Sequence, residues 1–166
     1  SAQFGSGSLS PAAGFTVQSW FNSSNIGSSW QRIIDLGNGA GSDNIIVGIT
    51  SSQLFMATYN GSNGLNFVAG PTLSNNTWYQ VSAVFTSGTA ILYLNGQKVG
   101  TNYAMWQLNN VPRTNNYWGK SNWSGNPAWQ GQQDELRIWN RPLTPAQIQA
   151  NWNAAYSGTQ PNLIAY

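Results

Sequence analysis

The chain has 166 residues, no Cys, no His and ten charged residues, six basic and four acidic. A chain of this length favours a single domain, and a net charge of +2 provides no electrostatic field for nucleic acid. The missing residue types exclude disulfides, zinc–thiolate sites, thiol nucleophiles and Ser-His-Asp catalysis.

Short segments rich in β-branched and aromatic residues, separated by Gly, Asn and Ser, predict an all-β fold of antiparallel strands. In chain order we expect strands at Ala2–Phe4, Phe15–Phe21, Gln31–Leu36, Asn44–Thr50, Leu54–Tyr59, Trp78–Thr86, Ala90–Leu94, Tyr117–Gly119 and Glu135–Trp139. The turn sequences Ser87-Gly88 and Asn95-Gly96 predict two successive hairpins. Four aromatic residues inside strands are expected in the core: Trp20, Phe55, Phe85 and Trp139.

One short helix is predicted near the C-terminus. Thr144 is a good N-cap, Pro145 suits the first helical position, and Gln147 completes a capping box. Leu143 and Ile148 are spaced as a hydrophobic staple, and Ile148 shares a helix face with Trp152. Gly158 and Pro161 prevent continuation. We expect this helix to pack against the sandwich and close it.

The four acidic residues are the candidates for carboxylate catalysis: Asp35, Asp43, Asp134 and Glu135. Glycoside hydrolysis commonly needs two carboxyl groups about 5–9 Å apart. Asp134 and Glu135 are neighbours on a predicted strand, so their side chains should point to opposite faces. A Gly-rich turn joins Asp35 to Asp43 and does not constrain their separation. The sequence therefore predicts a protein that is not an enzyme.

Four Trp residues fall in predicted loops: Trp30, Trp106, Trp123 and Trp129. The segment Trp106–Trp129 also contains many Asn residues. An aromatic ring offers a flat apolar surface to a sugar, and an amide both donates and accepts hydrogen bonds. We therefore expect Trp106, Trp123 and Trp129 to stack on sugar rings, with Asn122 and Asn126 supplying hydrogen bonds. The alternative is that these Trp side chains only close the ends of the sandwich.

Three segments resemble, in the same order, the laminin-G-like domains of the concanavalin A-like lectin/glucanase superfamily. They read GFTVQSWFN (Gly14–Asn22), WYQVSAVFTSGTAILYLNGQKVG (Trp78–Gly100) and WGKSNWSGNPAWQGQQDELRIWNRPLT (Trp118–Thr144). The resemblance implies an antiparallel two-sheet jelly-roll β-sandwich with one short C-terminal helix. It also implies a structural calcium ion near QDELRIWN, for which Asp134 is the one candidate ligand; alternatively, Asp134 is only a turn residue. The acidic cluster of the family's glucanases has no counterpart here.

We expect residues 1–156 to form the domain and residues 157–166 a linker and strand-like tail. Leu163–Tyr166 resembles the family's opening strand, which implies a tandem array cut between repeats. The tail would then either fill a vacant position beside Glu135–Trp139 or pair with a neighbouring chain; otherwise it is a frayed terminus.

These observations predict a secreted or cell-surface module of a larger multidomain protein, which binds neutral glycan without chemistry, as a lectin does, or serves in adhesion. We expect neither nucleic acid as a partner nor insertion into a membrane, because no apolar run reaches the roughly 18 residues that a span needs. The alternative is a structural spacer or self-assembling repeat that contacts a neighbouring protein domain, or associates with itself through the C-terminal strand. An accessory domain of an enzyme is a third possibility.

Overall fold

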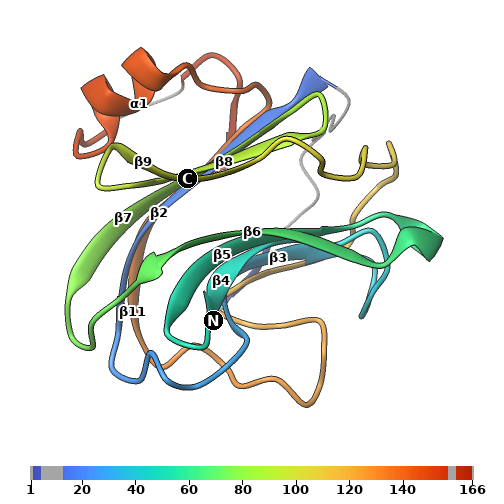
Figure 1. The fold of residues 1–166 in the computed structure, drawn as a ribbon, viewed down its shortest axis with the longest axis horizontal. Helices are drawn as coiled ribbons and strands as arrows, with labels where there is room; N and C mark the ends of the chain where they lie inside the picture. Colours follow the sequence, from blue (N-terminus) through green and yellow to red (C-terminus); the bar gives the residue numbers. More distant parts are fainter. Residues whose placement is uncertain (1, 5–12, 157–159, 166) are drawn as a thin grey trace.

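The computed structural model describes residues 2–4, 13–156 and 160–165. Two six-stranded antiparallel sheets lie face to face (Figure 1). Sheet A has the strand order β1-β10-β3-β4-β5-β6, and sheet B has the order β12-β11-β2-β7-β8-β9. The predicted antiparallel two-sheet sandwich with one short helix is therefore confirmed.

The bounds of the elements follow in chain order: β1 Ala2–Phe4, β2 Phe15–Ser23, β3 Gln31–Gly37, β4 Ile45–Thr50, β5 Gln53–Tyr59, η2 Gly61–Asn63, β6 Leu65–Thr72, β7 Trp78–Thr86, β8 Thr89–Leu94, β9 Gln97–Asn102, β10 Asn115–Trp118, β11 Gly131–Trp139, α1 Pro145–Asn151 and β12 Leu163–Ala165.

All nine predicted strands are present, and two further strands, β6 and β9, were not predicted by range. Both lie at an edge of their sheet. An edge strand tolerates Pro, which explains why Pro71 can lie within β6. Strand β9 has the mainly polar sequence QKVGTN, which carries little of the alternation typical of a half-buried strand.

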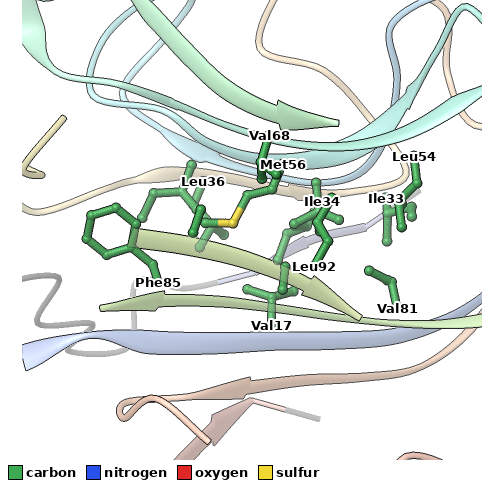
Figure 2. Packing of buried hydrophobic residues seen from close by; sticks show 14 of the residues in the cluster. Val17, Ile33, Ile34, Leu36, Leu54, Met56, Val68, Val81, Phe85 and Leu92 are labelled. Carbon is green, nitrogen blue, oxygen red and sulfur yellow. The ribbon is translucent and has the colours of Figure 1, made fainter. Parts of the chain in front are cut away.

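The main core lies between the sheets (Figure 2). Val17 and Phe85 of sheet B and Ile34 and Met56 of sheet A are all at most 2 % exposed. Of the four aromatic residues expected in the core, Phe85 lies in this cluster, where it stacks on Phe15 with ring centroids 5.5 Å apart.

The other three expected core aromatics lie on the outer faces of the sheets. Phe55 and Trp139 are buried in smaller clusters, and Trp20 is only half-buried against Trp152. The expectation for Trp20 was therefore wrong. Part of the outer face of each sheet is covered by other parts of the chain, so apolar character did not distinguish the two faces of a strand.

Helix α1 covers part of the outer face of sheet B (Figure 1). The predicted capping box is confirmed, because Thr144 Oγ1 accepts from Gln147 N while Gln147 Oε1 accepts from Thr144 N. Leu143 and Ile148 are both buried against Trp139. The helix thus closes this side of the sandwich, as expected.

Strand β12 pairs with β11, with Trp139 opposite Leu163 and Ile138 opposite Ala165. The predicted strand beside Glu135–Trp139 is therefore confirmed for Leu163–Ala165. Tyr166 and Gly158 lie outside the described residues. The tandem array and the division at residue 156 stay predictions.

Candidate functional site

A β-bulge in β3 places two charged side chains on the outer face of sheet A. In a regular strand, residues three apart point to opposite faces. Here the register shifts between Arg32 and Ile34, so that Arg32 lies opposite Gly48 and Ile34 opposite Val47. Because of the extra residue, Arg32 and Asp35 point outward together, and Arg32 Nε lies 3.5 Å from Asp35 Oδ2.

The Asp35 carboxylate is fully buried and fastens a loop to the sheet. Oδ1 accepts from Asn44 Nδ2 and Asn122 Nδ2, both at 2.8 Å, and Oδ2 accepts from the backbone N–H of Asn122 at 3.0 Å. Gly37 leaves room for these amides, because a Cβ at this position would lie 2.3 Å from Asn44 Nδ2. The loop 119–130, between β10 and β11, is thereby held over the outer face of sheet A.

Three aromatic rings surround the Arg32 guanidinium. Its Cζ lies 5.6 Å from the ring centroid of Trp30, 5.8 Å from that of Phe55 and 5.4 Å from that of Trp123. Burial lowers the pKa of Arg32, and the attraction of Asp35 opposes that shift. Within the described residues Arg32 Nε has no hydrogen-bond partner. The Arg32 cation therefore lies among rings from the residue before β3, from β5 and from the loop 119–130.

These rings continue into an exposed surface. Tyr59 packs on Trp123 with centroids 5.2 Å apart, and burial raises the pKa of the Tyr59 hydroxyl. Phe67 lies opposite Ala57 and therefore shares the outer face; it is 53 % exposed, and Trp30 is 40 % exposed. We name this set the aromatic face of sheet A. It comprises Trp30, Phe55, Tyr59, Phe67 and Trp123.

The aromatic face of sheet A is a neutral surface. Its two charged residues, Arg32 and Asp35, are paired and at most 3 % exposed. Lys120 lies at the β10 side, 4.7 Å from the ring centroid of Tyr117. The exposed residues of this set, such as Trp30 and Phe67, are therefore aromatic and uncharged, which suits a neutral partner better than a charged one.

The three Trp residues predicted to act together lie in different surroundings. Trp123 belongs to the aromatic face of sheet A. Trp129 lies edge-on to Phe21 of sheet B, with centroids 5.8 Å apart, and its indole nitrogen donates to the Gln132 carbonyl. Trp106 is 40 % exposed in the loop between β9 and β10.

The two Asn residues predicted to bind sugar have internal partners. Asn122 Nδ2 donates to Asp35 and to the Asn115 carbonyl, and Asn126 Nδ2 donates to Ser121 Oγ at 3.1 Å. Their amide nitrogens therefore serve to shape the loop that presents Trp123.

Asp134 lies at a second β-bulge, which interrupts the alternation expected for Asp134 and Glu135. Glu135 has a positive φ of 49°, its amide donates to Asp134 Oδ1, and its carboxylate pairs with Arg137. Calcium takes six to eight oxygen ligands. Across residues 2–4, 13–156 and 160–165, no three Asp, Glu, His or Cys side chains gather as a metal site. The described acidic residues therefore do not form a calcium site by themselves.

Sequence reasoning missed Arg32, Tyr59 and Phe67, and it considered Asp35 only as a candidate for carboxylate catalysis. The one local signal is the segment Arg32-Ile33-Ile34-Asp35, in which two charged residues flank two Ile residues within a strand. Two consecutive buried Ile side chains break the expected alternation and are consistent with a bulge. Phe67 gave no signal, because its strand was not predicted.

A family model described as the concanavalin A-like lectin/glucanases superfamily matches residues 1–149. Among solved structures, domain 4 of AbnA, an extracellular arabinanase from Geobacillus stearothermophilus in complex with arabinotriose, has a TM-score of 0.70 at 18% identity, over 89% of this chain and 70% of that chain. The CBM40 of a Ruminococcus gnavus sialidase bound to α2,3-sialyllactose has a TM-score of 0.69 at 13% identity, over 90% of this chain and 96% of that chain.

A native heptameric SAP-like pentraxin from Limulus polyphemus has a TM-score of 0.65 at 17% identity, over 85% of this chain and 70% of that chain. At these identities the likeness concerns the fold. A search of curated protein sequences found no match. None of the described helices is long and apolar enough to cross a membrane.

Proposed function

Because this chain belongs to the concanavalin A-like lectin/glucanase superfamily, we propose that it is a non-catalytic, extracellular carbohydrate-binding module of a larger protein. The observation that carries the proposal is the aromatic face of sheet A, where exposed rings surround a buried ion pair. Two of the similar structures hold arabinotriose and sialyllactose, which supports a glycan as the class of ligand.

The ligand we propose is a neutral glycan. Trp123 is the central contact, because its ring is half-buried and packs against both Tyr59 and the Arg32 guanidinium. A ring fixed in this way loses little side-chain entropy when a sugar stacks on it. Individual ring contacts contribute about 1 kcal/mol, so we expect single-site binding to be weak and to be strengthened when several modules act together.

The other predicted ligand residues have distinct proposed roles. Asn122 and Asn126 hold the loop that carries Trp123, and we propose that their side-chain carbonyl oxygens accept hydrogen bonds from sugar hydroxyls. Trp106 and Trp129 are proposed as further stacking residues, at the two loops where they lie.

Calcium at Asp134 remains a separate proposal. The exposed carboxylate would need backbone carbonyls and waters to complete the shell, since Asp134 Oδ1 already accepts from the Glu135 amide. Calcium would act there as a structural ion that stabilises the bulge.

The proposal is tested with an array of neutral oligosaccharides, followed by titration calorimetry with the strongest binder. Trp123→Ala should weaken binding at least about tenfold, and Trp123→Phe, which keeps a smaller ring, by less. Tyr103→Ala is the matched control, because Tyr103 is an aromatic residue that is 78 % exposed and belongs to no proposed site. Melting curves establish that each variant is folded.

Parallel titrations of Trp106→Ala and Trp129→Ala decide whether these residues contribute. Unchanged binding by Trp123→Ala, or an array without any ligand, would contradict the proposed site. An empty array together with self-association in sedimentation would instead favour the structural spacer.

A further inference from the structure

A second group of Trp side chains lies on the outer face of sheet B, on the opposite side of the sandwich. Trp78 begins β7 and is 42 % exposed. It lies opposite Asn22 of β2, and Asn22 lies opposite Gln132 of β11. Directly opposite residues in antiparallel strands share a face, so these three side chains form one row across three strands.

The adjacent row is anchored by two packed indoles. Trp20 of β2 lies opposite Gln80 and Asp134, and its ring centroid is 5.8 Å from that of Trp152 at the end of α1. Trp152 in turn rests on the turn between β8 and β9, where a Cβ at Gly96 would lie 2.5 Å from its Cδ1. The helix end and the turn therefore fix the pair of rings beside the exposed Trp78.

The polar groups of this surface are available, in contrast to those around Trp123. Among the residues that the structure describes, neither the side-chain amide of Asn22 nor that of Gln132 has a hydrogen-bond partner. Gln132 is exposed and Asn22 is half-buried. A side-chain amide offers two donor hydrogens and an acceptor oxygen, the complement of a row of sugar hydroxyls.

The charge of the two rows also restricts the partner. Asp134 is the one charged residue in the rows Gln132–Asn22–Trp78 and Asp134–Trp20–Gln80. A polyanion such as nucleic acid or a sulfated glycan would find no cation in these rows and would meet a carboxylate. An exposed indole flanked by free amides fits a neutral polyhydroxylated chain.

We propose that Trp20, Asn22, Trp78, Gln132 and Trp152, which we name the Trp78 face, form a second binding surface for neutral glycan. The proposal rests on the proposed function for the class of ligand, but on different residues and the other sheet. Because the two faces point in opposite directions, one module would hold two glycan chains at once and bridge them.

The test uses three soluble neutral polysaccharides as probes: arabinan, β-glucan and galactomannan. Affinity electrophoresis measures binding, and turbidity of the mixed solution measures bridging by the module. For a polysaccharide that retards the wild type, Trp78→Ala should weaken binding about five- to tenfold and abolish turbidity.

Trp123→Ala should likewise weaken binding and abolish turbidity, and the double variant should not bind. Gln132→Ala, at an exposed position, should weaken binding without altering the melting temperature, and Tyr103→Ala should change neither readout.

The outcomes separate the two proposals. If Trp123→Ala loses binding while Trp78→Ala and Gln132→Ala behave as the wild type in both assays, the Trp78 face is refuted and the proposed function stands. If Trp78→Ala loses binding and Trp123→Ala does not, the Trp78 face is supported and the site on sheet A is refuted. A wild-type dimer in sedimentation that Trp78→Ala converts to monomer would show that this surface binds a second copy of the chain, which would overturn the inference.

Discussion

Replacing Asp35 by Asn should destabilise the protein far more than its distance from the main core suggests. The substitution leaves Arg32 charged, 3 % exposed and without its counterion. It also turns an amide nitrogen toward at least one of the three donors that now bond the carboxylate at 2.8–3.0 Å. Removing one partner of a buried ion pair costs about 3–5 kcal/mol, a large share of the roughly 5–15 kcal/mol that stabilises a typical domain.

Urea denaturation followed by Trp fluorescence measures this loss in Asp35→Asn, Arg32→Met and the double variant. The double variant should be at least about 2 kcal/mol more stable than the sum of the single losses predicts, because it leaves no unpaired charge. Lys120→Met is the matched control: this exposed cation also lies over a ring, and its loss should change the free energy of unfolding by less than about 0.5 kcal/mol. A loss below about 1 kcal/mol for Asp35→Asn, or additive single losses, would refute the reasoning.

Four further results are expected. Gly48→Ala should cost about 1–3 kcal/mol in urea denaturation, because its Cβ would lie 2.2 Å from a backbone carbonyl in the bulge; an unchanged midpoint would contradict this. Burial raises the pKa of Tyr59 above the ordinary 10.0, so its contribution to the free energy of unfolding should be complete below pH 10 and decline as pH rises through the higher folded value. Tyr59→Phe should flatten that decline, and an identical pH profile of stability in the variant would count against the argument. If calcium binds at Asp134, the melting temperature should be higher in millimolar calcium than in EDTA, and Asp134→Ala should remove the difference; equal melting temperatures would leave Asp134 a bulge residue only. Deleting residues 162–166 should cost more than about 0.5 kcal/mol, because Leu163 and Ile164 pack against the two core clusters; a smaller loss would mean that β12 adds nothing.

The sequence by itself determined the features that depend on neighbouring residues. The strand at Trp78–Thr86, the turn at Ser87-Gly88 and the cap at Thr144 each follow from local backbone chemistry, and the structure confirms all three. The loop positions of Trp106, Trp123 and Trp129 were predictable for the same reason. These signals sufficed for an antiparallel sandwich, because alternation and turn residues specify strands and hairpins without reference to distant partners.

Only the tertiary structure decided which side of each strand met the core and which residues met on its outer faces. Alternation cannot distinguish two faces that are both covered, and so Trp20 was assigned to the core although it packs against Trp152. The pairing of Arg32 with Asp35 depends on a bulge, which exists only because β3 pairs with β4 across a shifted register. Trp123 came to lie on Tyr59 because Asp35 fastens its loop from 87 residues away in the sequence. Long-range pairing fixes such contacts, and no local pattern encodes it.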